Sequence, residues 1–333
     1  MHFTESAHMS DLIHDDYRLL QVISRFGVSL GFGDQTVEAA CKASGVDTAT
    51  FLAVVNFIQN EGHLSVDELA EEVSVTELMR YLQRSHSYFL DFRLPAIRRK
   101  LIESIDCSAK NQIAFLILRF YDEYAAEVQR HMEYENTHIH TYVQQLLEGK
   151  LPPARGTQSA ATYSVLAHQH HDNHASLTKS GHELKSIIIK YYPSDSDTQR
   201  LADTLMDIYI MEEDLFSHCR LEDSLFAESV RLLEVEVKAK IQEGGFTANA
   251  SPKVQADSEM SGSDELSERE KEVICHVVRG LSNKEIAEKM FISANTVMTH
   301  RRNIARKTQI HSPAGLTIYA IVNGLINLEE VKL

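Results

Sequence analysis

Cysteine, proline and glycine are all scarce in this sequence, and tryptophan is absent. The 333 residues include only 4 Cys, 6 Pro and 14 Gly. Four cysteines with no CxxC spacing argue against a disulfide framework and against a cysteine-based zinc site. So little Gly and Pro also argues against a turn-rich β-sandwich, and it favours a long helical protein.

Long apolar runs are lacking too. No stretch approaches the roughly 18 uninterrupted apolar residues of a membrane helix, and the first thirty residues lack the basic and then apolar regions of a signal peptide. We therefore expect a cytoplasmic protein with no membrane partner. The hydrophobic content of 43% is enough for real cores, and the length suits about two domains.

Charge is unevenly distributed along the chain. The net charge is −15, yet residues 264–333 hold ten Lys and Arg against nine Asp and Glu, a net of +1 that leaves −16 elsewhere. An acidic body repels polyanions, so we expect any contact with nucleic acid at the C-terminal end.

One segment is too polar to bury a core. Residues 244–264, GGFTANASPKVQADSEMSGSD, are poor in large apolar side chains, which predicts a flexible linker. A weaker break lies near residues 60–63. The sequence therefore predicts a small helical domain over 1–62, a larger helical body over 63–243, the linker over 244–264 and a C-terminal domain over 265–333.

The larger body carries a helical pattern of apolar residues. Between residues 65 and 235, four segments repeat apolar side chains at spacings of three and four, which places one stripe along one face of each helix. The longest break between them is the loop expected at 151–160. An all-α fold with an antiparallel four-helix bundle is the expected architecture.

Histidine and glutamate stand on these stripes where Leu or Ile would be expected. Two of the helices carry a His-x3-Glu pair, and residues four apart lie about 5–6 Å from each other on one helix face. Buried ionisable groups without a partner cost several kcal/mol per ion, so the set needs a shared partner. The candidate metal ligands are His86, His131, Glu135, His174, His218 and Glu222.

The donor types favour iron. Imidazole and carboxylate ligands together suit iron, and two carboxylates from facing helices can bridge a metal pair, so we expect a di-iron centre. Zinc stays open, because a set of His and Glu does not exclude it. Haem is another alternative, because inward His and Met residues can ligate haem iron.

The ligand on the third helix is the least constrained. His174 ranks first because its stripe continues into apolar residues, with His171 and then His170 as alternates. His138 lies one turn beyond Glu135 and points inward by helical phase, either as a rival ligand or as a second donor. The remaining histidines are expected to face solvent, among them His140, His168 and His182.

Several segments resemble a known family. FLILRFYDEYAAEVQRHMEYE and MEEDLFSHCRLEDSLF are similar to the second- and fourth-helix motifs of hemerythrin-like di-iron proteins of the type that repairs iron centres, and HSYFLDFRLPAI resembles their first helix. The resemblance spans about residues 14–230. LGFG at 30–33 stands where that family usually has adjacent cysteines, so its thiol chemistry does not carry over. Residues 137–139 read Thr-His-Ile where the family has Leu-Phe-Pro.

The C-terminal domain shows two capping boxes. Ser267 with Glu270 opens a helix that ends at Gly280, and Ser282 with Glu285 opens a second, short helix. A tight turn at 291–293 leads into a third helix, ANTVMTHRRNIARK, with a basic outer face. Two short helices around such a turn fit a DNA major groove.

This C-terminal segment closely resembles the LuxR-type helix-turn-helix, through LSERE, GLSNKEIA, NTV and HRRNI. The resemblance implies that base edges are contacted by Met298, Thr299 and Arg302. Phosphates are assigned to Lys284, Ser293, Thr296 and Arg306, and Arg301 projects outward from the same helix. The apolar final helix, residues 314–323, pairs two domains in that family, which implies a homodimer on an inverted repeat of double-stranded DNA.

Together these features predict a one-component transcription regulator. A di-iron bundle would sense oxygen, nitric oxide or redox state and control DNA binding, and no catalytic residues are assigned. One alternative is an enzyme-like protein that donates iron, repairs iron centres or handles diatomic molecules, with secondary DNA binding. The other is a regulator whose bundle binds haem or serves as a structural dimerisation module.

Overall fold

The computed structural model describes residues 2–60, 65–104, 112–151, 163–192, 198–242, 266–308 and 310–326, with the side chains of 112, 163–173 and 242 left out. All regular elements within these ranges are helices, which confirms the all-α prediction. None of the described helices is long and apolar enough to cross a membrane. The predicted linker, 244–264, lies outside the described residues.

The chain forms two compact units. The first comprises Met1–Pro95, Val128–Ala175 and Ile210–Ala248, and the second comprises Ala96–Glu127, Ser176–Tyr209 and Asn249–Leu333. Three long helices, α8, α10 and α11, contribute residues to both units. Their bounds are Gln112–Tyr134 for α8, Tyr163–Tyr191 for α10 and Thr198–Leu221 for α11.

The first unit begins with four short helices whose ends are fixed by local capping. The Asp47 carboxylate accepts a hydrogen bond from the backbone N–H of Thr50 at 2.8 Å and starts the fourth helix. Gly27, with φ +83°, ends the second in the left-handed conformation that glycine adopts without strain. The four are α1 (Met9–Asp15), α2 (Leu19–Phe26), α3 (Val37–Ser44) and α4 (Thr48–Gln59).

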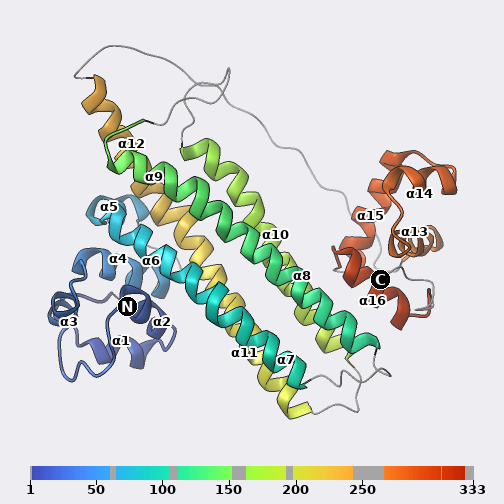
Figure 1. Ribbon diagram of the computed structural model, residues 1–333, viewed down its shortest axis with the longest axis horizontal. Coiled ribbons are helices and arrows are strands. Elements are labelled where there is room, and N and C mark those ends of the chain that lie inside the picture. The colour runs from blue at the N-terminus through green and yellow to red at the C-terminus, as the bar shows by residue number, and fades with distance from the viewer. Residues whose placement is uncertain are drawn as a thin grey trace. The chain divides into compact units, whose positions relative to one another are not determined.

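Four helical rods form the rest of the first unit, and Figure 1 shows them side by side with alternating direction, the predicted antiparallel bundle. Three of them contain a short π-helix (η). The first rod follows α5 (Val66–Glu72). The rods are α6 (Val75–Ser87) with η1 (Tyr88–Arg93); the end of α8 with η2 (Glu135–Ile139) and α9 (His140–Leu147); the start of α10; and the end of α11 with η3 (Glu222–Phe226) and α12 (Ala227–Gln242).

One hydrophobic core joins the short N-terminal helices to these rods. Phe51 of α4, Leu82 of α6, Val143 of α9 and Phe226 of η3 are each no more than 1% exposed and belong to the same cluster. The N-terminal helices therefore buttress the bundle instead of forming a separate core. The boundary expected at residues 62 and 63 falls among residues that the structure does not describe, and it stays a prediction.

A buried arginine ties α2 to α11. Arg25 is 5% exposed and donates two hydrogen bonds to the Asp214 carboxylate, at 2.6 and 2.8 Å. Its guanidinium also lies over the rings of Tyr88 and Phe89, 4.9 and 5.1 Å from their centroids. Charge pairing and ring stacking together compensate for the desolvation of this side chain.

The second unit contains most of α7 (Leu94–Ser104), parts of α8, α10 and α11, and the C-terminal domain. That domain consists of α13 (Glu268–Val278), α14 (Asn283–Met290), α15 (Ala294–Thr308) and α16 (Pro313–Val322). Its own core includes Val273, Ile286, Val297 and Ile304, all at most 1% exposed.

Within the second unit, α10 packs closely on the start of α16. Glu183 of α10 is 1% exposed and accepts hydrogen bonds from the backbone N–H groups of His311 and Ser312 and from the Ser312 hydroxyl, at 2.7–3.2 Å. A Cβ added to Gly315 would lie only 2.1 Å from Oε1 of Glu183. Glycine at this position therefore permits the close approach.

Replacing Arg25 by alanine is expected to lower the free energy of unfolding by about 3 kcal/mol, because it leaves Asp214 without its buried partner. Denaturation by urea, followed by circular dichroism, measures the change. Arg98 makes a matched control, because its pair with Asp122 is exposed at both ends and its loss should cost less than about 1 kcal/mol. Equal losses in the two variants would contradict this account.

Candidate functional site

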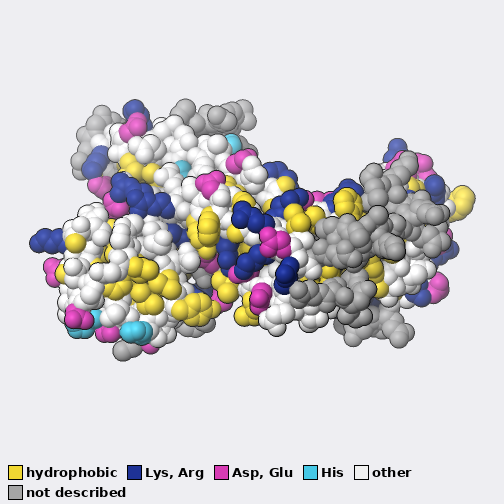
Figure 2. All heavy atoms as spheres, turned by 60° about the horizontal axis from the view of Figure 1, so that its bottom comes forward, with side chains coloured by type: hydrophobic (Ala, Val, Ile, Leu, Met, Phe, Trp, Pro, Cys, Tyr) yellow, Lys and Arg dark blue, Asp and Glu magenta, His cyan; other side chains and the backbone are white. Residues whose placement is uncertain are grey.

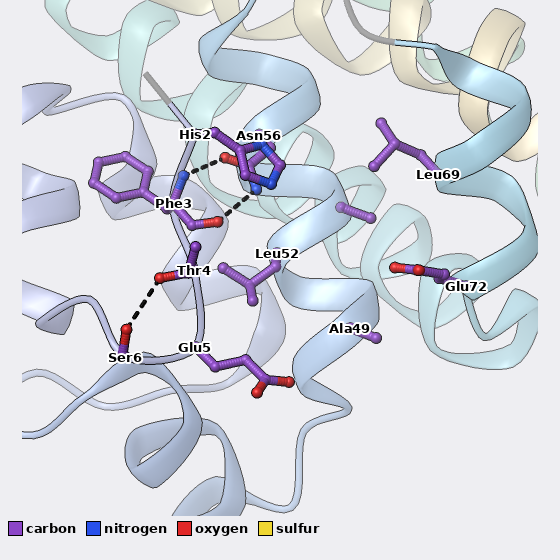
Figure 3. A pocket seen from close by; sticks show the side chains of 11 residues that line it. His2, Phe3, Thr4, Glu5, Ser6, Ala49, Leu52, Asn56, Leu69 and Glu72 are labelled. Atoms are coloured by element: carbon purple, nitrogen blue, oxygen red, sulfur yellow. Dashed lines mark hydrogen bonds between the residues drawn. The ribbon is translucent and has the colours of Figure 1, made fainter.

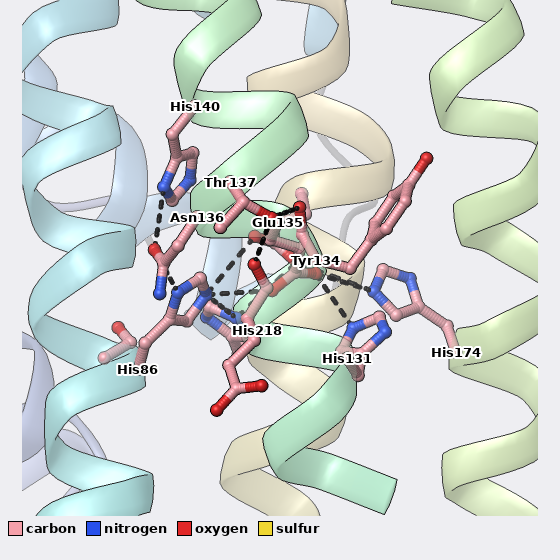
Figure 4. Close-up of polar contacts among 12 residues, drawn as sticks. His86, His131, Tyr134, Glu135, Asn136, Thr137, His140, His174 and His218 are labelled. Atoms are coloured by element: carbon pink, nitrogen blue, oxygen red, sulfur yellow. Dashed lines mark hydrogen bonds and ion pairs between the residues drawn. The ribbon is translucent and has the colours of Figure 1, made fainter.

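Six ionisable side chains from four helical rods meet inside the first unit, and Figure 4 labels His86, His131, Glu135, His174 and His218 among them. Each is at most 5% exposed, so all six are shielded from solvent. They are the six residues that the sequence predicts as ligands: His86 from α6, His131 from α8, Glu135 from η2, His174 from α10, His218 from α11 and Glu222 from η3.

The six residues form two overlapping groups with the spacing of metal ligands. In each group, one ligand atom from every residue lies within 4.8 Å of the others. Glu135 and Glu222 belong to both groups. The first group adds His86 and His218, and the second adds His131 and His174. Two carboxylates with two imidazoles on either side are an arrangement that can bind a pair of metal ions, with the carboxylates shared between them.

The Glu135 carboxylate divides its oxygens between the two groups. Oε2 lies 3.0 Å from Nε2 of His86, and Oε1 lies 2.8 Å from Nε2 of His131. Glu222 is placed similarly, with Oε1 3.8 Å from Nε2 of His86 and Oε2 3.5 Å from Nε2 of both His174 and His218. The Nε2 atoms of all four histidines therefore face the carboxylates.

A π-helix accompanies the ligands on three of the four rods. η2 begins at Glu135, η3 begins at Glu222, and η1 begins two residues after His86. A π-turn adds a residue to the helical repeat, and such turns are frequent at functional sites. Side chains beyond each ligand are consequently rotated relative to a regular α-helix.

Two predictions near Glu135 are wrong: the inward position of His138, which was predicted from helical phase, and the solvent exposure expected for His140. His138 was expected to point inward, but it is exposed: its ring stacks on that of Tyr134 at 4.4 Å, and its Nδ1 lies 3.1 Å from the Tyr134 carbonyl oxygen. His140 was expected to face solvent, but it is 2% exposed. η2 spans Glu135–Ile139 and ends directly before His140, and the buried positions that follow Glu135 are Ile139 and His140.

Polar side chains behind the cluster orient two of its histidines. The Asn136 amide oxygen lies 3.0 Å from Nδ1 of His86 and 3.1 Å from Nδ1 of His140, and an Asp223 carboxylate oxygen lies 2.9 Å from Nδ1 of His174. These oxygens accept hydrogen bonds, so each Nδ1 donates and Nε2 is directed into the cluster. Such partners fix the ring orientation of metal-binding histidines.

The pKa values of three histidines in the cluster are shifted, and two of them are raised. Burial opposes protonation of His86, but hydrogen bonds to Glu135 and Glu222 raise its pKa to about 10. Burial likewise opposes protonation of His174, whose pKa is nevertheless raised, with Asp223 as the strongest contributor. Burial lowers the pKa of His218 to about 3. Metal binding would displace the protons of the charged imidazoles, since imidazole ligates in its neutral form.

The third rod places His174, the first-ranked candidate, in the cluster. The side chains of His170, His171 and His168 lie outside the described residues. His182 is exposed, as expected. Sequence reasoning missed Asn136 and Cys219, and the buried Cys219 forms a third ligand-like group with His131 and His174.

A separate pocket of about 410 Å³ lies between the N-terminal residues and α4 (Figure 3). Its wall is fixed by Phe3, whose backbone N–H donates to the Asn56 side chain and whose carbonyl accepts from it. The pocket shares no residue with the metal-ligand groups. Figure 2 shows histidine side chains at a few points on one face of the molecule.

The C-terminal domain has the predicted helix-turn-helix geometry. Both capping boxes are present, at Ser267 with Glu270 and at Ser282 with Glu285, which confirms the two helix starts. The turn between α14 and α15 passes through Phe291, which adopts φ +54° and is 95% exposed. The Ser293 hydroxyl then accepts the backbone N–H of Thr296 and caps α15.

The predicted DNA-contacting residues lie on the outer side of this motif. Arg301 is half-buried and donates a hydrogen bond to the Asn283 side chain at 2.8 Å, so it also fastens α15 to α14. Thr296 is likewise half-buried. The exposed members are Lys284, Ser293, Met298, Thr299, Arg302 and Arg306.

Comparison with known proteins identifies this domain. Residues 264–320 match the family described as bacterial regulatory proteins, luxR family. The all-helical chain therefore carries a C-terminal LuxR-type helix-turn-helix domain, as predicted. No solved structure matches the chain.

Curated relatives share only part of the chain. The transcriptional regulatory protein MctR of Rhizobium johnstonii is 37% identical over 82 residues, 25% of this chain and 38% of its own length. A nitrate/nitrite response regulator protein homolog of Haemophilus influenzae is 29% identical over 142 residues, which are 43% of this chain and 62% of the relative's own length. The transcriptional regulatory protein LiaR of Bacillus subtilis is 39% identical over 64 residues, which are 19% of this chain and 30% of its own length. The chain thus spans less than two thirds of each relative.

A metal ion bound by the cluster would be held about 10- to 100-fold more weakly after Asn136→Ala, because His86 loses the hydrogen bond that orients its ring. Isothermal titration of the metal-free protein with cobalt(II) measures the affinity. His138→Ala is the matched control, because His138 is exposed and lies only two residues after Asn136. The cobalt(II) affinity of this variant should equal that of the unmodified protein. A larger loss in His138→Ala than in Asn136→Ala would refute the orientation described here.

Proposed function

We propose that this protein is a one-component transcription regulator, in which a metal pair held by the bundle controls DNA binding by the LuxR-type domain. The observation that carries the proposal is the pair of overlapping ligand groups that share Glu135 and Glu222. Both groups occur in one chain with a DNA-binding domain. A sensor and its output domain in a single polypeptide need no separate signalling partner.

The residues of the cluster suit a pair of iron ions. His86 and His218 would hold one ion, His131 and His174 the other, and the two glutamates both. Nitrogen and oxygen donors of this kind suit iron. A haem would require apolar space between its axial ligands, where here the two carboxylates lie. An iron pair would supply a reversible redox change and affinity for oxygen or nitric oxide.

On the output side, we propose that α15 enters the major groove of an inverted repeat. Met298, Thr299 and Arg302 would contact base edges, with Met298 favouring an apolar partner such as a thymine methyl group. Phosphate contacts are assigned to four other predicted residues of this face: Lys284, Ser293, Thr296 and Arg306. Two copies would pair through α16, which places two recognition helices on one site.

A signal changes DNA affinity only if it favours one of two protein conformations. The helix α10 supports such coupling, because it carries His174 and, nine residues later, Glu183. Glu183 holds the backbone at the start of α16. We propose that a change in how His174 is held alters α10, and that α16 then exchanges its contact with Glu183 for pairing with a second copy.

The proposal predicts that DNA affinity differs between the reduced and oxidised iron-loaded protein. Titration of operator DNA under anaerobic and aerobic conditions measures this difference. Glu135→Ala is expected to remove the bound iron and the difference together, because both ligand groups lose a shared carboxylate. The exposed Glu133 provides the control, and Glu133→Ala should retain both. Equal affinities in the two oxidation states of the unmodified protein would show that the bundle does not sense redox state.

Arg302→Ala is expected to weaken operator binding by about 1–3 kcal/mol and to relax base preference at one position. Arg269→Ala, which removes the same charge from an exposed position on α13, should leave both the affinity and the base preference unchanged. Fluorescence anisotropy with operator variants at several salt concentrations separates the two cases. If Arg302→Ala reduced only the salt dependence, by about one unit of slope, the residue would contact phosphate instead.

A further inference from the structure

A buried thiol lies beside one half of the proposed metal centre. Cys219 is 6% exposed, and its Sγ lies within 4.8 Å of a ring nitrogen of His131 and of His174. The same two histidines complete the second ligand group, and their rings pack at 4.7 Å between centroids. The thiol is therefore part of a three-residue cluster of metal-ligating side chains.

The thiol faces the second group and is absent from the first. Cys219 follows His218 directly on α11, and successive residues on a helix point about 100° apart. His218 consequently serves the group with His86, whereas Cys219 approaches the group with His131 and His174. Neighbouring positions on one helix thus serve different halves of the centre.

We propose that Cys219 is a thiolate ligand of the metal ion held by His131 and His174. This inference rests on the proposed function, since it requires that the cluster binds metal. When the sulfur–metal bond forms, the thiol proton leaves to solvent and no electron is transferred. The two metal positions then differ in chemistry: one has imidazole and carboxylate donors alone, and the other also has a soft sulfur donor.

The difference has a consequence for which metals bind and where. Thiolate ligands favour softer ions such as zinc and iron over ions that prefer oxygen alone. The position with sulfur is expected to fill first with a soft divalent ion. The sulfur donor also makes the two ions of a bound pair electronically unequal. One of the two ions would therefore be oxidised or reduced in preference to the other.

Cobalt(II) is a suitable probe, because a thiolate bound to it gives an intense charge-transfer band in the near ultraviolet. Metal-free, full-length protein would be titrated with cobalt(II) under anaerobic conditions, and bound metal would be counted in parallel. The unmodified protein is expected to bind two ions per chain, with the thiolate band complete after one. Cys219→Ser should lose the band and keep at least one bound ion.

Cys41→Ser is the matched control, because Cys41 is also buried but lies on α3 outside the ligand groups; it should keep the band. Should Cys219→Ser fail to fold, Cys219→Ala replaces it, with circular dichroism as the check. Two bound ions with no thiolate band in the unmodified protein would overturn this inference alone. A band that persists without Cys219 would also overturn it. Absence of any bound cobalt would refute the proposed metal centre together with it.

Discussion

Glu135 and Glu222 lie between four imidazoles in the interior of the first unit, and the arrangement of the bundle depends on this contact. Two buried carboxylates cost several kcal/mol each unless cations lie next to them. In the metal-free protein, charged imidazoles fill that role, as the raised pKa values of His86 and His174 indicate. The same geometry suits a pair of metal ions, which would bind both carboxylates at once.

Helix irregularity is closely connected with this constraint. A regular α-helix can present a histidine and a glutamate four residues apart, but three of the rods depart from regularity at or just after a ligand. Such π-turns are rare inside α-helices and are frequently found at functional sites. Here the turns at Glu135 and Glu222 place the two shared carboxylates, and the turn after His86 re-aims the helix that leads away from it.

Local spacing in the sequence predicts much of this site. The two His-x3-Glu pairs and the two capping boxes involve residues three or four apart, so the sequence alone is enough to identify them. What spacing cannot reveal is a change of helical period, and that change is why His138 lies outside and His140 inside. The contributions of Asn136 and Cys219 also depend on tertiary contacts, between rods that are distant in sequence. The contact of Glu183 with α16 spans about 129 positions and has no local signature.

The bundle and the C-terminal domain are identified by different features. The C-terminal domain is identified by its match to the luxR family and by exposed polar side chains on α15. The bundle is distinguished by the buried histidines and glutamates of the cluster. In the proposed mechanism, α10 and the contact of Glu183 with the start of α16 would couple the bundle to the DNA-binding domain. The acidic body and the near-neutral C-terminal segment would also favour DNA binding at the C-terminal end of the chain.

The central claim is that six side chains hold two metal ions between shared carboxylates. X-ray diffraction from crystals of the iron-loaded protein, recorded above and below the iron absorption edge, locates the ions directly. The account predicts two anomalous peaks between Glu135 and Glu222, one beside His86 and His218 and the other beside His131 and His174. A single peak, or iron located away from these carboxylates, would contradict it.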